Sequence, residues 1–271
     1  MNKTRQLHIA LIQMDIELAN PTVNQQRAEQ WITQAMSAAP RPDVIVLPEM
    51  WNTGYALDRL EGLAERENGK LTAWMSQIAK QHQIVLVGGS ISEQRESGFY
   101  NTLYVYGADG ERTAKYDKIH LFKLMNEEKF MQPGEEKALF PLHDVTAAAS
   151  ICYDLRFPEL ARSLALAGAQ IWFVPAEWPH PRMHHWRTLL TARAIENQMY
   201  VVACNRVGRD EKSEFFGHSM IIDPWGEVLA EGDEVEGIIS ATIDLDLADE
   251  VRGRIPVFAD RRPELYIHEQ K

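Results

Sequence analysis

Three residues of the chain have side chains suited to nucleophilic catalysis, and each lies at or just after an apolar run. Glu49 ends "VIVLPE", Lys118 lies in "KYDKIHLF" and Cys152 ends "AASIC". A cysteine thiolate is a nucleophile, a carboxylate can take its proton, and an ammonium can stabilise a developing negative charge. If the three side chains meet in one cavity, this set predicts covalent catalysis by the cysteine.

Each of these residues also has a purely structural interpretation. A free cysteine is commonly a small buried hydrophobic residue, a glutamate at a loop start can reach solvent, and a lysine near a strand end is usually solvated. The second cysteine, Cys204 in "YVVACNRVG", is interpreted in this way. The chain has no Cys-x-x-Cys motif, so the sequence gives no support to a thiol redox protein.

The elements that must position these residues alternate between apolar runs and helical patterns. Strands are predicted at 7–14, 43–49, 84–91, 101–107, 145–152, 171–176 and 200–208. Helices are predicted at 21–39, 70–82, 157–167 and 183–198. Asn20 is a cap before Pro21, and Gly168 ends the third helix. The alternation predicts an α/β fold with mixed sheets, and strand ends in such sheets commonly form ligand crevices.

The last part of the chain has a different pattern. The stretch "FFGHSMIIDPWGEVLAEG" has a Pro-Trp-Gly turn between two apolar runs, which predicts a hairpin. The stretch "EGIISATIDLDLADEVRGRIPV" predicts a strand followed by a short helix.

Composition limits the classes of partner. The chain has 271 residues, no linker and no repeat, so we expect one domain over residues 1–271. Its net charge of −11, from 39 acidic and 28 basic residues, argues against nucleic acid and anionic membranes as partners.

No run approaches the roughly 18 apolar residues of a membrane span. The N-terminal apolar stretch is interrupted by Gln13 and Asp15 and is read as a strand, and the cysteine usage indicates a reducing cytoplasm.

Three motifs resemble a known family. In order, "LPEMWNTGY", "KYDKIHLF" and "ICYDLRFPEL" are similar to the signature regions of the nitrilase superfamily of carbon–nitrogen hydrolases. Matches in "YNTLYVYGADGE", "HWRTLLTARAIENQMYVVACNRVG" and "GHSMIIDPWGEV" extend the resemblance over about 7–245. It implies a four-layer α-β-β-α sandwich with two mixed sheets, a C-terminal extension at 246–271 and a homodimer. The chain most resembles the omega-amidase branch, which hydrolyses the terminal amide of 2-oxo acids such as 2-oxoglutaramate.

The resemblance also implies a catalytic set. The Glu-Lys-Cys residues of the family fall on Glu49, Lys118 and Cys152, and a second glutamate falls on Glu127, with Glu128 as the neighbouring alternative. Glu49 would take the proton of the thiol and later give a proton to the departing ammonia. Lys118 and the backbone N–H of Tyr153 would stabilise the oxyanion, although a proton-donor role for the lysine stays open. The route needs neither a metal nor an organic cofactor.

Substrate-binding residues are predicted from their positions beside the motifs. Arg156, four residues after Cys152, is a candidate for binding the carboxylate of a 2-oxo acid. The alternative is an ion pair with Asp154 or Glu159. Other candidates for the pocket wall lie after apolar runs: Tyr55, Glu177 and Trp178.

Other functions are alternatives to the omega-amidase hypothesis. The same three catalytic groups serve hydrolases of N-carbamoyl amino acids, deaminated peptides and nitriles. A non-catalytic binding module would tolerate loss of the reactive groups, yet all three are present. In "WPHPRMHHW", His180 and His184 are four residues apart, but the flanking prolines oppose a regular helix. No nearby cysteine or carboxylate completes a zinc-type set with them or with His185, so we expect no metal site.

Overall fold

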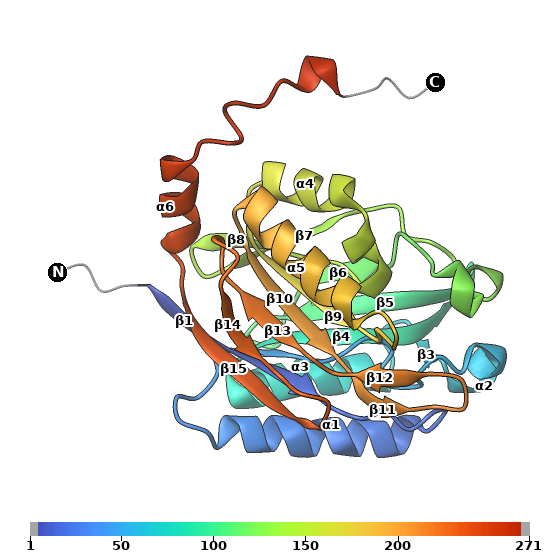
Figure 1. The fold of residues 1–271 in the computed structure, drawn as a ribbon. Helices are drawn as coiled ribbons and strands as arrows, with labels where there is room; N and C mark the ends of the chain where they lie inside the picture. Colours follow the sequence, from blue (N-terminus) through green and yellow to red (C-terminus); the bar gives the residue numbers. More distant parts are fainter. Residues whose placement is uncertain (1–4, 267–271) are drawn as a thin grey trace.

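Two mixed β-sheets form the centre of the fold (Figure 1). The computed structural model describes residues 5–266. The strands of the first sheet are β1 (Gln6–Gln13), β2 (Val44–Val46), β3 (Glu65–Arg66), β4 (Val85–Arg95), β5 (Gly98–Tyr106), β6 (Arg112–Asp117) and β15 (Gly237–Asp244). Those of the second sheet are β7 (Ala138–Leu142), β8 (Val145–Ala149), β9 (Ala169–Ala176), β10 (Tyr200–Asn205), β13 (Met220–Ile222) and β14 (Val228–Glu231).

Each sheet has parallel strands at its centre and antiparallel strands toward its edges. The first has the order β15-β1-β2-β4-β5-β6, with β3 paired to β4, and the second has the order β14-β13-β10-β9-β8-β7. The neighbours β1, β2 and β4 run parallel, as do β8, β9 and β10. The predicted hairpin is present as the antiparallel pair β13–β14. A separate small hairpin joins β11 (Val207–Arg209) to β12 (Glu214–Phe216).

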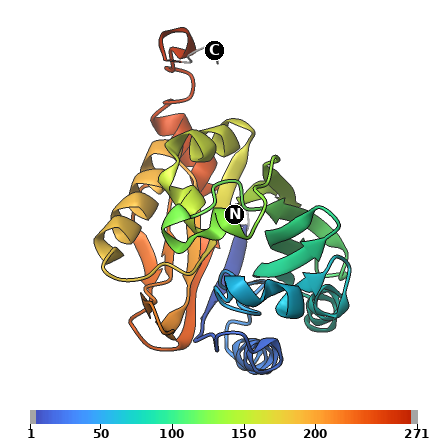
Figure 2. The ribbon, with the colours of Figure 1, turned by 90° about the vertical axis from the view of Figure 1, so that its right-hand side faces the viewer.

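Helices cover the outer faces of both sheets. The first sheet packs against α1 (Pro21–Met36) and α3 (Lys70–His82), and the second against α4 (Pro158–Leu166) and α5 (Met183–Asn197). Figure 2 shows the two sheets side by side between these helix layers. The short helices are α2 (Leu60–Leu63) and α6 (Leu247–Arg254). The predicted four-layer α-β-β-α sandwich is therefore confirmed. No helix within residues 5–266 has the length and apolar character needed to cross a membrane.

The four long helices form where the sequence predicts them. The side chain of Asn20 accepts a hydrogen bond from the backbone N–H of Val23 and caps α1. Gly168 follows α4 with a φ of +101°, a conformation that glycine adopts without steric cost. One face of α5 is buried and includes Trp186, Leu190 and Ala194, whereas Leu189 stays partly exposed.

The strand predictions are correct in position but wrong in several limits. The run 200–208 is not one strand, because β10 ends at Asn205 and β11 begins at Val207. The strands β6 and β7 were not predicted. The sequence of β6, "RTAKYD", is polar because this strand lies at the edge of its sheet and keeps solvent contact. The strands β2 and β8 end early, which leaves Glu49 in the loop after β2 and Cys152 in the 3-10 turn that follows β8.

Candidate active site

The predicted catalytic residues meet in one buried cluster between the two sheets. Glu49 lies three residues after β2, and Lys118 directly follows β6, so both come from the first sheet. Cys152 lies three residues after β8 in the second sheet, and Glu127 begins a 3-10 turn, η3 (Glu127–Lys129). Glu49, Lys118 and Glu127 are fully buried, and Cys152 is 7% exposed. Segments distant in the sequence thus place a thiol, a carboxylate and an ammonium together.

The Lys118 ammonium is the centre of this cluster. Its Nζ donates to Glu49 Oε1 and to Glu127 Oε2, each at 2.8 Å, and to the Tyr55 hydroxyl at 3.0 Å. An ammonium has three N–H groups, so all of its donors are used. To donate to a substrate oxygen, Lys118 must release one partner. The neutral Tyr55 hydroxyl is held less strongly than either carboxylate.

Asn101, on β5, links the two glutamates. Its Nδ2 donates to Glu49 Oε1 at 3.0 Å and to Glu127 Oε1 at 2.9 Å. The backbone N–H of Phe122 donates to Glu127 Oε2 at 2.7 Å. Sequence reasoning missed Asn101, since an asparagine in a strand has no distinctive pattern.

The structure places Glu127, and not Glu128, in the cluster. Glu127 is fully buried, whereas the side chain of Glu128 is exposed to solvent. Neighbouring residues in such a turn face different directions, so only one can reach Lys118. This geometry resolves the one-residue ambiguity left by the doubled glutamate.

The charges of the cluster shift the pKa values of its members in different directions. Burial alone would raise the pKa of Glu49, but the Lys118 charge and hydrogen bonds lower it below its ordinary value. Burial raises the pKa of Glu127; Lys118 opposes this, and the Glu49 charge adds to it. Burial works against the ammonium, yet Glu127 and Glu49 raise the pKa of Lys118. Glu49 is therefore ionised and Lys118 keeps its proton.

Cys152 is held as a thiol beside a carboxylate. Burial raises its pKa well above the usual value, the Glu49 charge adds to this, and Lys118 acts in the opposite direction. The residue has a φ of +45°, which is strained for a side chain other than glycine. It begins a 3-10 turn, η4 (Cys152–Arg156), and α4 starts only after that turn. Glu49 is the carboxylate that lies beside this thiol.

A small pocket opens onto Cys152. Its lining residues are Tyr55, Phe122, Cys152, Tyr153, Arg156, Glu177, Trp178, Pro179 and Arg182. The pocket-wall candidates from the sequence, Tyr55, Glu177 and Trp178, are all among them, as are Tyr153 and Arg156. The wall combines aromatic rings with charged groups, as is typical of small-ligand sites. Arg182, which follows the loop after β9, was not predicted.

Neither arginine of this cavity pairs with a carboxylate among residues 5–266: Arg156 Nη2 lies near His185 Nδ1, and the Arg182 guanidinium lies over the Phe122 ring. Asp154, the expected partner of Arg156, instead accepts hydrogen bonds from Tyr116 and the backbone of His120. The Arg156 guanidinium lies over the Trp178 ring, 4.5 Å from its centroid. The ion-pair alternative for Arg156 is thus wrong. Burial lowers the pKa of Arg156, and the nearby Arg182 charge lowers it further.

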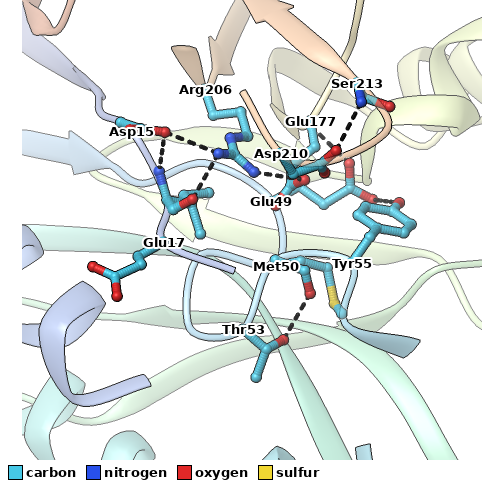
Figure 3. A network of polar contacts seen from close by, with 12 residues as sticks. Asp15, Glu17, Glu49, Met50, Thr53, Tyr55, Glu177, Arg206, Asp210 and Ser213 are labelled. Carbon is cyan, nitrogen blue, oxygen red and sulfur yellow. Dashed lines mark hydrogen bonds and ion pairs between the residues drawn. The ribbon is translucent and has the colours of Figure 1, made fainter. Parts of the chain in front are cut away.

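A second polar network lies behind Glu49 (Figure 3). Glu177 follows β9, and its backbone N–H donates to Glu49 Oε2 at 2.8 Å. The Glu177 Oε2 atom lies 3.3 Å from Arg206 Nη1, and Arg206 Nη2 donates to Asp15 Oδ1 at 2.9 Å. Arg206 is fully buried and occupies the break between β10 and β11.

The histidines of "WPHPRMHHW" are distributed over different contacts. The backbone of His180 bonds to Glu214, His184 lies beside His185, and the His185 ring is 3.4 Å from Arg156 Nη2. In the described part of the chain, no group of three or more His, Cys, Asp or Glu side chains is arranged to hold a metal ion.

Comparison with known proteins identifies the family. The sequence model described as carbon–nitrogen hydrolase matches residues 8–253. The chain belongs to the carbon–nitrogen hydrolase family. This confirms the family indicated by the three sequence motifs and makes the protein an enzyme of that type.

Several carbon–nitrogen hydrolases are similar over nearly the whole chain. The 2-oxoglutaramate amidase of Bacillus subtilis (strain 168) is 46% identical, with 95% of this chain and 98% of that protein covered. The omega-amidase NIT2 of Homo sapiens is 37% identical, with 97% and 98% covered. The crystal structure of Saccharomyces cerevisiae Nit3, of the nitrilase superfamily, superimposes with a TM-score of 0.88 at 32% identity, covering 95% of this chain and 97% of that chain.

Proposed function

We propose that this protein is an omega-amidase that releases ammonia from the terminal amide of a small 2-oxo acid such as 2-oxoglutaramate. The observation that carries the proposal is the cavity at Cys152, which combines the nucleophile with Arg156 and Arg182. Two guanidinium groups without a carboxylate partner suit a substrate that brings its own carboxylate. The similarity to a 2-oxoglutaramate amidase supports the same substrate class.

The first half of the proposed reaction forms a thioester. Glu49 takes the proton of Cys152 as the sulfur attacks the amide carbon, which overcomes the raised pKa of the resting thiol. The resulting oxyanion accepts hydrogen bonds from the backbone N–H of Tyr153 and from Lys118, which exchanges its Tyr55 contact for the substrate oxygen. Because its pKa is raised, Lys118 acts through its charge rather than as a proton donor.

The second half removes ammonia and restores the enzyme. Protonated Glu49 gives its proton to the leaving nitrogen, since an amide anion cannot leave. Water, deprotonated by the same carboxylate, then attacks the thioester and releases the free acid. Glu127 is a positioning residue in this scheme, because it holds Lys118 at 2.8 Å opposite Glu49.

Hydrolysis of a panel of substrates tests the proposal, followed by ammonia release or, for the deaminated peptide, by release of the free amine. The panel contains 2-oxoglutaramate, 2-oxosuccinamate, an N-carbamoyl amino acid, a deaminated peptide and a simple nitrile. We expect the highest kcat/KM for a 2-oxo acid amide. The highest kcat/KM for the nitrile, the carbamoyl compound or the deaminated peptide would contradict the substrate class. No turnover of any compound would favour a non-catalytic binding module.

Arginine variants test the carboxylate site itself. Arg156→Met and Arg182→Met should each lower kcat/KM for 2-oxoglutaramate by roughly 10- to 100-fold, the value of a hydrogen bond to a charged group. Their effect on butyramide, an amide without a carboxylate, should be much smaller. Arg187→Met is the matched control, because this arginine lies on the exposed side of α5 and pairs with Glu231. Equal losses on both amides would assign the two arginines a structural role.

The proposal extends to the organisation of the protein. We propose one catalytic domain over residues 1–271, with a core at about 7–245 and an extension at 246–271, acting as a cytoplasmic homodimer. In Figure 1 the chain after α6 extends away from the sandwich. It carries exposed apolar residues, among them Ile255, Leu265 and Tyr266, which a second copy can cover. Light scattering should give twice the chain mass, and a monomer would contradict the dimer.

A further inference from the structure

One oxygen of the Glu177 carboxyl group has no hydrogen-bond partner in the described part of the chain. Glu177 is 1% exposed, and its Oε1 is a buried atom that no group of residues 5–266 contacts by a hydrogen bond. Glu177 also lines the cavity at Cys152. Among residues 5–266, it is the one lining residue with such an unpartnered buried side-chain atom. Leaving a buried polar atom unpaired is energetically unfavourable, so this oxygen is a candidate for binding a ligand group.

The rest of Glu177 is fixed by the protein. Its backbone N–H holds Glu49 Oε2, and its Oε2 lies against Arg206 Nη1. Figure 3 shows the Arg206 side chain between Asp15 and Glu177. With Oε2 directed to Arg206, the unpartnered Oε1 is the atom of Glu177 left for a molecule in the cavity.

The surrounding charges favour the neutral form of this carboxyl group. Glu177 shares Arg206 with Asp15, so one cation serves two carboxyl groups. Burial raises the pKa of Glu177 to about 8; Arg206 opposes this, and Glu49 and Asp210 add to it. Because Arg206 donates to Oε2, the proton of the neutral acid belongs on Oε1. A buried carboxylic acid of this kind is a hydrogen-bond donor.

We propose that Glu177 binds the substrate as a neutral acid, with Oε1–H donating a hydrogen bond to a carbonyl oxygen of the bound 2-oxo acid amide. This inference rests on the proposed amidase function. The acceptor is either the amide oxygen or the 2-oxo oxygen, which have the same chemistry. A neutral Glu177 also avoids repelling the carboxylate of the substrate, which an ionised one would do.

Two substitutions separate hydrogen bonding from shape. In Glu177→Gln, Arg206 retains the side-chain oxygen and so places the NH2 group where Oε1–H was, which preserves a donor. Glu177→Leu has no donor. We expect Glu177→Leu to lower kcat/KM for 2-oxoglutaramate by roughly 5- to 100-fold, and Glu177→Gln to recover most of that loss. Equal losses in the two folded variants would overturn the inference.

The pH profile provides a readout that a structural role would not change. In the wild type, kcat/KM should fall as the pH rises through about 8, because Glu177 ionises and loses its donor proton. Glu177→Gln has no such proton, so its profile should lack this alkaline limb. The charged groups that act on Glu177 are Arg206, Glu49 and Asp210, and Cys152, Arg156 and Arg182 line the same cavity; Glu177→Gln leaves all of them in place. The same alkaline limb in both proteins would contradict the proposal, even if Glu177→Leu does not fold.

A second substrate identifies the acceptor. Glutaramate has the same amide and carboxylate as 2-oxoglutaramate but no 2-oxo group. A Glu177→Leu loss on both compounds assigns the bond to the amide oxygen, and a loss on 2-oxoglutaramate alone assigns it to the 2-oxo oxygen. No loss on either refutes the inference while leaving the amidase function intact. If the wild type releases no ammonia from either compound, the proposed function itself fails.

Discussion

Replacing Lys118 by methionine should destabilise the protein in a manner that depends on pH. The ammonium is fully buried and holds Glu49 and Glu127 at 2.8 Å each, and Asn101 brings these carboxyl groups toward each other. Methionine fills a similar volume without charge. Removing one partner of a buried ion pair costs about 3–5 kcal/mol, because the remaining charge is left uncompensated. We expect a loss of this size at pH 7.5.

The pH dependence follows from the protons that the variant must bind. In the wild type Lys118 keeps the pKa of Glu49 low, so this group is ionised in the folded state. Without the Lys118 charge, burial raises the pKa of Glu49, so Glu49 binds a proton in the folded variant. Above about pH 4.5, Glu49 has lost that proton in the unfolded variant. Stability of the variant relative to wild type then falls by about 1.4 kcal/mol per pH unit. The loss should therefore be about 2.7 kcal/mol smaller at pH 5.5 than at pH 7.5.

Urea unfolding of both proteins at the two pH values measures this difference. Lys129→Met is the matched control, because Lys129 is exposed in the same turn as Glu127 and should change stability little at either pH. A loss of equal size at pH 5.5 and 7.5 would refute the reasoning. So would a Lys118→Met protein as stable as the wild type.

Two further predictions concern the surroundings of Glu49. Tyr55 donates to Glu49 Oε1 at 2.7 Å and so favours the ionised form of Glu49. Tyr55→Phe should therefore raise the pKa of Glu49 and move the acid limb of the kcat/KM profile up by about one pH unit. An acid limb at the wild-type pH would contradict this prediction. Gly89 has a φ of +62°, and a Cβ there would lie 2.1 Å from the carbonyl oxygen of Pro48, beside Glu49. Gly89→Ala should therefore lower the free energy of unfolding in urea by about 1–3 kcal/mol and should lower activity. Gly62→Ala is the control and should change neither, because a Cβ at Gly62 meets no atom within 4 Å. Equal behaviour of the two variants would show that the close approach at Gly89 does not position Glu49.

The sequence predicted the main elements because their signals are local. Apolar runs and helix caps depend on neighbours in the chain, as at Asn20 and Gly168. The positions of Glu49 and Cys152 near strand ends were predicted from the same local signal, because each residue ends or follows an apolar run. The convergence of Glu49, Lys118 and Cys152 was implied by the family motifs rather than by any local pattern.

The missed features depend on contacts between distant segments. Asn101 reaches both glutamates only because β5 lies beside β6 in the sheet, and nothing in "YNTLYVYG" reveals that neighbour. Arg182 faces Cys152 through the loop after β9. Arg206 lies at a break between two strands that the sequence pattern predicts as one. Its buried charge is balanced by Asp15, nearly 200 positions away, so no local pattern reveals the break.

Turnover by a Cys152→Ala protein tests the central claim most directly. The substitution removes only the sulfur atom from the cluster and leaves Glu49, Lys118 and Glu127 in place. With 2-oxoglutaramate as substrate, the variant should unfold at an unchanged or higher urea concentration and release no ammonia above the uncatalysed rate. Ammonia release at the wild-type rate would contradict the account.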